Sequence, residues 1–198
     1  MKILAIGTDP LDLQTNCAGM FEKFINSGHS VTLIIADNKK QPRLSNTIKE
    51  LYKNSGISKV HFVTNFDFSK VTQNNVNLIN SIIDKINPSI AVIPSIKSCD
   101  KKKIVLAKSS ILACRKIKNI LIYKTGKKET FSPDVFFIPS TNSLQNKILS
   151  SHQKKNISKK NFGKTSNPAH VLYRFNSTDK GIESFESHRM VLLENDLF

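Results

Sequence analysis

The order of strand-sized and helix-sized segments at the start of the chain is the strongest constraint on its fold. Residues 3–6 form an apolar run with the length of a buried strand, and residues 29–37 repeat that pattern. Between them, residues 15–27 place apolar side chains at helical spacing, and Gly28 follows as a C-terminal cap. A strand, a helix and a strand in this order predict a βαβ unit with parallel strands.

The same alternation continues through the rest of the chain. Further helices are expected at residues 44–55, 75–87, 104–117 and 143–152. Further strands are expected at residues 60–63, 90–93, 120–123, 135–138 and 189–193, the last of them at a sheet edge. Residues 153–167 are polar and rich in Lys, Asn and Ser, which predicts a flexible surface loop. Together these segments predict one α/β domain over residues 1–198, a Rossmann-like three-layer sandwich with a mostly parallel sheet.

The chain is strongly basic, with 30 Lys and Arg against 15 Asp and Glu and a formal net charge of +15. Such a field favours nucleic acid, anionic lipid or another polyanion as a partner. The competing interpretation is a solvated lysine-rich surface, because most of the lysine clusters fall in expected loops. We do not expect nucleic-acid binding, since no helix-turn-helix, RNP or zinc-finger pattern is present.

The apolar runs and the cysteines indicate the compartment. No apolar run approaches the about 18 residues that a transmembrane helix needs, and the N-terminal run is too short for a signal peptide. The 3 cysteines are an odd number without metal-ligand spacing, which is typical of reduced thiols. We therefore expect a cytoplasmic protein without disulfides.

Two loops at the carboxyl ends of expected strands carry the charged groups that point to a site. The loop after the first strand holds Asp9 and Asp12, and the loop after residues 90–93 holds Asp100 followed by lysines 101–103. Ligands of open α/β sheets bind at such carboxyl ends. Neither loop matches a dinucleotide-binding or phosphate-binding glycine motif. From the residues alone, Asp9 and Asp12 can instead cap a helix, or join Asp100 around Mg²⁺ or Ca²⁺, although the lysines oppose a cation.

Three motifs in order give the sequence a resemblance to a known family. They are Gly7-Thr-Asp-Pro-Leu-Asp-Leu-Gln, Cys17-Ala-Gly and Gly28-His-Ser-Val-Thr-Leu. They resemble the Gly-Ala-His-Pro-Asp-Asp-Ile-Glu, Cys-Gly-Gly and Gly-His-x-Val-Thr-Leu motifs of the PIG-L/LmbE-like zinc-dependent de-N-acetylases of N-acetylglucosamine conjugates. Later segments follow in the same order, among them Ser132-Pro-Asp-Val-Phe and Glu183-Ser-Phe. The resemblance covers nearly the whole chain and implies a PIG-L/LmbE-like fold.

The same resemblance places departures at the positions that carry the family's chemistry. The first zinc-binding His is Asp9 here, the general-base Asp is Leu11, and the second ligand is kept as Asp12. The later His-Pro-Asp-His element aligns with residues 100–103, so its last ligand becomes Lys103. Zinc prefers His and Cys ligands, and a leucine accepts no proton. We therefore expect no zinc, no other cofactor and no confident catalytic residue, with the Lys103 ammonium beside Asp9 and Asp12.

Four further residues fall where the family lines its substrate cleft. They are Asp100, Arg43, Asp67 and His152. Arg43 and Asp67 also suit ordinary loop salt bridges, and His152 also suits a surface position.

These observations leave three hypotheses about function. The first is a deacetylase homologue that has lost its zinc ligands and general base and serves as a non-catalytic binding or regulatory protein in glycoconjugate metabolism. Its partner would be a sugar conjugate or another protein. The second is an active hydrolase of an N-acetylglucosamine conjugate with a rearranged metal site. The third is a basic module that binds a polyanion away from the cleft.

Overall fold

The structure is a computed structural model that describes residues 1–36, 55–126, 129–137 and 183–189. The helix expected at residues 143–152, nearly all of the helix expected at 44–55 and the loop expected at 153–167 lie outside these ranges. Arg43 and His152 lie outside them as well. Among the described residues, no helix is both long enough and apolar enough to span a bilayer.

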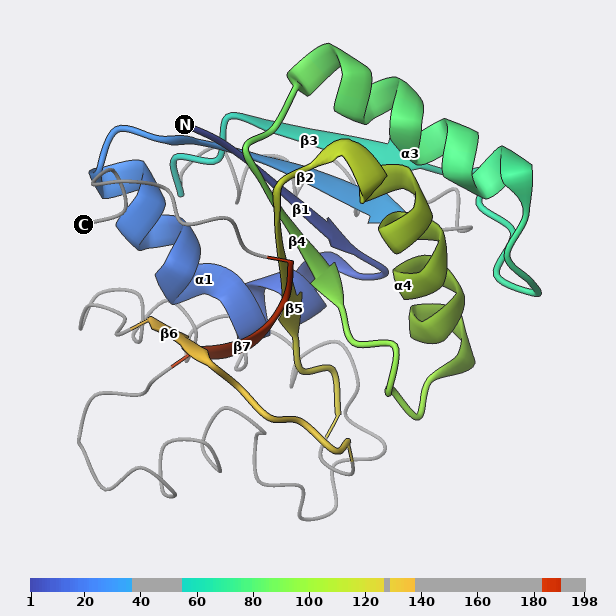
Figure 1. Ribbon diagram of the computed structural model, residues 1–198. Helices are drawn as coiled ribbons and strands as arrows, with labels where there is room; N and C mark the ends of the chain where they lie inside the picture. The colour runs from blue at the N-terminus through green and yellow to red at the C-terminus, as the bar shows by residue number, and fades with distance from the viewer. Residues whose placement is uncertain (37–54, 127–128, 138–182, 190–198) are drawn as a thin grey trace, which may run out of the picture.

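The described chain forms one seven-stranded sheet with helices on both faces (Figure 1). The strands are β1 (Lys2–Gly7), β2 (Ser30–Ala36), β3 (Lys59–Val63), β4 (Ile90–Pro94), β5 (Asn119–Tyr123), β6 (Val135–Phe137) and β7 (Glu183–Arg189). The helices are α1 (Pro10–Asn26), α3 (Gln73–Ile86) and α4 (Lys101–Ala113), and a short 3-10 helix (Cys114–Lys116) follows α4. The strand order is β3-β2-β1-β4-β5-β7-β6, parallel from β3 to β5, with β7 antiparallel to both of its neighbours. The predicted α/β class with a mostly parallel sheet is confirmed.

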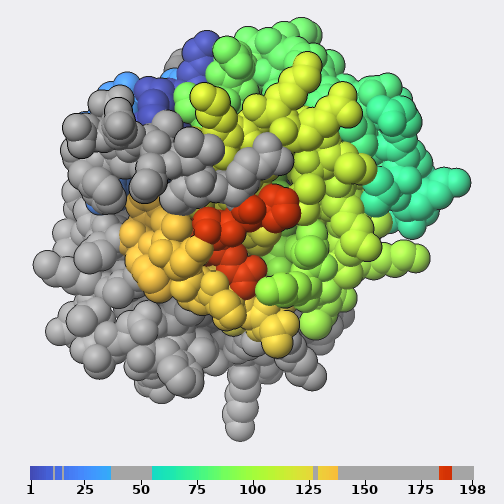
Figure 2. Space-filling view, in the orientation of Figure 1, coloured from blue at the N-terminus to red at the C-terminus, as the bar shows by residue number. Residues whose placement is uncertain are grey.

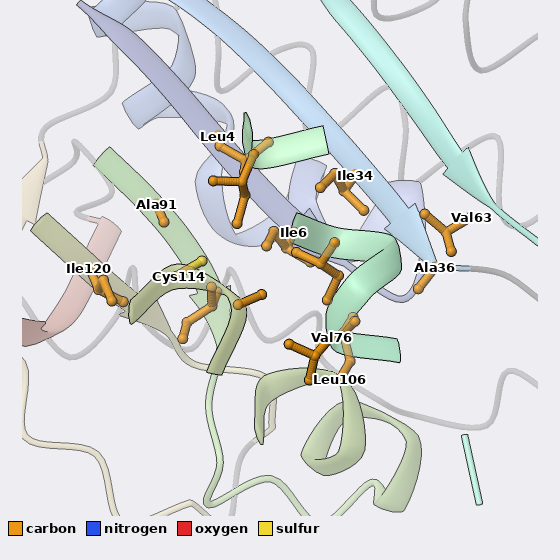
Figure 3. Close-up of a cluster of buried hydrophobic side chains, with 14 of the residues drawn as sticks. Leu4, Ile6, Ile34, Ala36, Val63, Val76, Ala91, Leu106, Cys114 and Ile120 are labelled. Atoms are coloured by element: carbon orange, nitrogen blue, oxygen red, sulfur yellow. The ribbon is translucent and has the colours of Figure 1, made fainter. Parts of the chain in front are cut away.

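Alternate side chains of the central strand β1 enter two separate hydrophobic cores. Ile3 and Ala5 pack with residues of α1, whereas Leu4 and Ile6 pack with residues of α3 and α4. Figure 3 shows part of the second core, where Leu4 and Ile6 lie among side chains from neighbouring strands and helices. Both faces of β1 are thus buried, as expected for a strand in the centre of a parallel sheet.

Helices α1 and α4 begin well before their apolar spacing predicts, and α3 begins at Gln73 instead of residue 75. Helix α1 starts at Pro10 rather than at residue 15, because proline is favoured at the first helical position, and the Asp9 carbonyl accepts the Asp12 N–H at 3.1 Å. Helix α4 starts at Lys101 rather than at residue 104, because the Asp100 carboxylate caps it by accepting the Lys102 N–H at 2.9 Å. Periodicity identified both helices but not the two residues that determine where they begin, Pro10 and Asp100.

Residues 190–193 of the strand expected at 189–193 lie outside the described ranges. The described strand in this part of the chain is β7, Glu183–Arg189, which lies between β5 and β6 and was not predicted. Its apolar signal is weak because Phe185 is the one apolar residue in the strand, and Glu183, Glu186 and Ser187 make polar contacts. Lys97 Nζ lies 3.2 Å from Glu186 Oε1, and the Ser187 N–H donates to Asp134 at 2.7 Å. In Figure 2, β7 (red) reaches the surface between the segment leading into β6 (orange) and the segment after β4 (green).

A buried carboxylate ties β7 to the middle of α1. The Glu183 carboxylate accepts the Gly19 N–H at 2.8 Å and the Met20 N–H at 2.7 Å, and Glu183 is only 6% exposed. The amide hydrogens of mid-helix residues ordinarily bond to carbonyls of the preceding turn. Here they also hold an anion from the far end of the chain, so Glu183 fixes α1, and with it Asp12 in the first turn of that helix and Asp9 just before it.

We predict that Glu183→Gln lowers the free energy of unfolding by about 2 kcal/mol, because an amide group replaces an anion that accepts two buried N–H groups. Urea denaturation of the purified protein measures the change. Glu186→Gln on the same strand is the matched control and should cost less than about 1 kcal/mol, because its ion pair with Lys97 and its hydrogen bond from the Ser132 N–H both lie at the exposed surface. Equal costs for the two variants would show that Glu183 does not have this role.

Candidate functional site

The candidate site lies where the strand order reverses, between β1 and β4, a position that we call the switch point. The chain leaves β1 into α1 on one face of the sheet and leaves β4 toward α4 on the other face (Figure 1). Because the two connections diverge, the carboxyl ends of β1 and β4 form the position where ligands of this architecture bind. The two charged loops singled out in the sequence both emerge at this position.

An ion pair between Asp12 and Lys103 joins these loops. Lys103 Nζ lies 2.7 Å from Asp12 Oδ1, although the residues are 91 positions apart in the chain. The side chains are only 15% exposed for Lys103 and 9% exposed for Asp12. The predicted proximity of the Lys103 ammonium to Asp12 is therefore confirmed.

Two further side chains complete the surroundings of the Asp12 carboxylate. The Tyr123 hydroxyl donates to Asp12 Oδ2 at 3.0 Å and also lies 3.3 Å from the Ile6 carbonyl oxygen. The Asn16 side-chain amide donates to Asp12 Oδ1 at 3.2 Å and to the Asp12 carbonyl at 2.8 Å. We call Asp12, Lys103, Tyr123 and Asn16 the switch-point network. Both carboxylate oxygens of Asp12 have partners within it.

Reasoning from the sequence missed Tyr123 as a member of this network. Tyr123 ends the otherwise apolar strand β5 and is fully buried. A buried tyrosine usually finds a partner for its hydroxyl. A tyrosine at the carboxyl end of a central strand was therefore a usable signal for a polar group at this position.

Opposing effects act on the protonation of Asp12. Burial raises the pKa of Asp12 above its ordinary value of 3.8, and the negative charge of Asp9 acts in the same direction. The Lys103 ammonium and the Tyr123 hydroxyl act to lower this pKa. Lys103 thus offsets part of the cost of keeping a carboxylate out of water.

The other predicted site residues lie in different settings. Asp9 is exposed and directly precedes α1, and Leu11 lies in the first turn of that helix. The Asp100 carboxylate is exposed and caps α4. Asp67 follows the edge strand β3, where hydrogen bonds from Ser69 hold its pKa below the ordinary value. The structure therefore brings Asp12 and Lys103 into contact. The carboxylates of Asp100 and Asp67 accept hydrogen bonds from backbone N–H groups two residues further along the chain.

The residues at the switch point do not suit zinc. Across the described ranges, no three or more His, Cys, Asp or Glu side chains gather into a group that could hold a metal. Cys17 and Cys114 are buried in opposite cores, and Cys99 is exposed. Zinc requires about four ligands, preferably His or Cys, whereas Asp12 faces an ammonium here. Asp9, Asp12 and Asp100, all three of them described residues, likewise do not gather into such a group.

We predict that Lys103→Met raises the pKa of Asp12 further, because it removes a positive charge that lowers this pKa. The variant should lose about 3 kcal/mol of unfolding free energy at neutral pH, where a nearly buried carboxylate is left without its cation. The folded chain binds the Asp12 proton more tightly than the unfolded chain does. The loss should therefore shrink as the pH falls through the raised pKa and the carboxylate becomes neutral.

Urea denaturation at a series of pH values, with carbon NMR of the Asp12 carboxyl, measures both effects. Lys97→Met is the matched control, since it removes a lysine of the loop before α4 that pairs with Glu186 instead. A difference between Lys103→Met and the original protein that does not change with pH would contradict this prediction.

Comparison with known proteins identifies the fold. No family model matches the sequence, and no curated protein matches it. Solved structures do match it over nearly their full length. The conserved protein TT1542 from Thermus thermophilus has a TM-score of 0.74 at 12% identity, with 98% of this chain and 97% of that chain covered.

Named enzymes are among these structural neighbours. The A40926 pseudoaglycone deacetylase Dbv21 has a TM-score of 0.72 at 13% identity, covering 96% of this chain and 98% of its own. The N,N'-diacetylchitobiose deacetylase from Pyrococcus horikoshii has a TM-score of 0.68 at 13% identity, covering 100% of this chain and 88% of its own. A hydratase, GalB from Pseudomonas putida, also matches, with a TM-score of 0.67 at 10% identity, covering 98% of each chain. The chain therefore has the PIG-L/LmbE fold of these deacetylases.

Proposed function

We propose that this protein is a non-catalytic relative of the deacetylases that share its fold, and that it binds a sugar conjugate without hydrolysing it. The observation that carries the proposal is the switch-point network, in which both oxygens of Asp12 are held by Lys103, Tyr123 and Asn16. A carboxylate held in this way is not free to ligate a metal or to take a proton from water.

The residue at the family's base position supports the same proposal. A general base must accept a proton within hydrogen-bond reach of the attacking water. The position of the family's base is Leu11 by resemblance, and a leucine side chain accepts no proton. The position of the third zinc ligand is Lys103, whose ammonium donates to Asp12. By resemblance, the substitutions thus remove a zinc ligand and the general base together.

The ligand class is drawn from the neighbours' names. One neighbour is a deacetylase of N,N'-diacetylchitobiose and another is a deacetylase of a glycopeptide pseudoaglycone. Ligands of open α/β sheets bind at the carboxyl ends of the strands. This chain has the strand reversal that creates such a position, and we propose that a sugar binds there. A fold that also includes the hydratase GalB does not by itself determine the reaction, so the residues of the site decide between binding and hydrolysis.

We predict that the purified protein binds N,N'-diacetylchitobiose without releasing acetate. Saturation-transfer NMR measures binding of the disaccharide, and an enzymatic acetate assay with and without added zinc measures hydrolysis. Chitobiose without its acetyl groups is the matched ligand control. Acetate release that disappears in Asp12→Asn would contradict the proposal and favour an active hydrolase with a rearranged metal site.

A further inference from the structure

We infer that Lys103 is a built-in cation that takes the place of a metal ion at the switch point and excludes divalent metals from it. The inference deepens the proposed function and rests on its premise that the site is not a zinc centre. It states how metal is excluded from the site. Sugar binding could occur whether or not metal is excluded in this way.

The first step is the charge at the carboxyl end of β1. Asp9 directly precedes α1 and Asp12 lies in the first turn of that helix, so two carboxylates stand three residues apart at this end of the strand. Two neighbouring carboxylates, one of them only 9% exposed, need a positive charge beside them. The Lys103 ammonium supplies that charge at 2.7 Å from Asp12.

The second step is the space around the Asp12 oxygens. A zinc ion would have to lie about 2.0–2.2 Å from a carboxylate oxygen. Lys103 Nζ already occupies a position 2.7 Å from Oδ1, and the Tyr123 hydroxyl lies 3.0 Å from Oδ2. A divalent ion at Asp12 would therefore have to displace the ammonium and would be repelled by it.

The third step is that α4 does not itself favour a lysine at this position. Lys103 lies in the first turn of α4, where the positive end of the helix dipole disfavours cations. Lys101 and Lys102 add like charges in the same turn. The ion pair with Asp12 offsets the unfavourable interaction of Lys103 with the helix dipole. The positive charge of the whole turn repels a metal ion.

The test restores histidines at the two positions and measures zinc. The variants are Asp9→His/Lys103→His and, as a matched control, Asp9→His/Lys97→His, which exchanges a lysine of the loop before α4. Each protein is exposed to zinc, dialysed and analysed for metal, and its unfolding midpoint is followed with and without zinc. Circular dichroism confirms that each variant is folded.

We expect the original protein and the control variant to retain no zinc and to show no shift in unfolding midpoint. Asp9→His/Lys103→His should retain about one zinc per chain, bound by the new histidines and Asp12. Its midpoint should rise by about 5 °C when zinc exceeds its dissociation constant a hundredfold. A folded Asp9→His/Lys103→His variant that takes up no zinc, or a control that takes up as much, would overturn the inference.

The original protein gives a test that does not depend on any variant with histidines. If it retains one zinc per chain, and Asp12→Asn loses that zinc, Lys103 does not exclude metal and the inference fails. The two proposals remain distinguishable. Zinc retention without acetate release overturns the built-in cation alone, whereas acetate release from the zinc-free protein overturns the proposed function alone.

Discussion

A nearly buried carboxylate at the point where the strand order reverses requires a positive charge, and the arrangement of the surrounding elements meets this requirement. Asp12 is brought there by α1, Lys103 by α4 and Tyr123 by β5. Three elements from different parts of the chain therefore meet at one side chain. Removing the charge from water costs several kcal/mol, so the network constrains how α1 and α4 are placed on the sheet.

The sequence predicted the apolar part of the fold well. Parallel strands buried on both faces appear as continuous apolar runs, so β1, β2 and β4 were identifiable without any structure. The beginnings of α1 and α4 were placed too late, because Pro10 and Asp100 determine them and neither contributes to an apolar period. Strand β7 was not predicted because contacts such as Glu183 with α1 stabilise it, and contacts over long sequence separations leave no local pattern.

The site was predictable only where charge or motif spacing marked it. Asp12 and Lys103 were singled out by loop position and by resemblance, and the structure places them in contact. Tyr123 was read as part of an apolar strand, since its hydroxyl acts only once the sheet is assembled. Asp100 and Asp67 are assigned to the cleft by resemblance, and that assignment stays a prediction; their carboxylates accept hydrogen bonds from nearby backbone N–H groups. Part of the net charge of +15 does not contribute to a binding surface, since Lys103 of the 101–103 cluster is mostly buried and pairs with Asp12.

The measurement that tests the central claim most directly is a double-mutant cycle of Asp12→Asn and Lys103→Met, carried out with and without EDTA. If the Lys103 ammonium is the counter-charge of Asp12, the unfolding free energies should show a coupling of about 1.5–3 kcal/mol. The same coupling should appear in EDTA, because no metal takes part. Additive effects within about 0.5 kcal/mol, or a coupling that depends on removal of metal, would contradict the account.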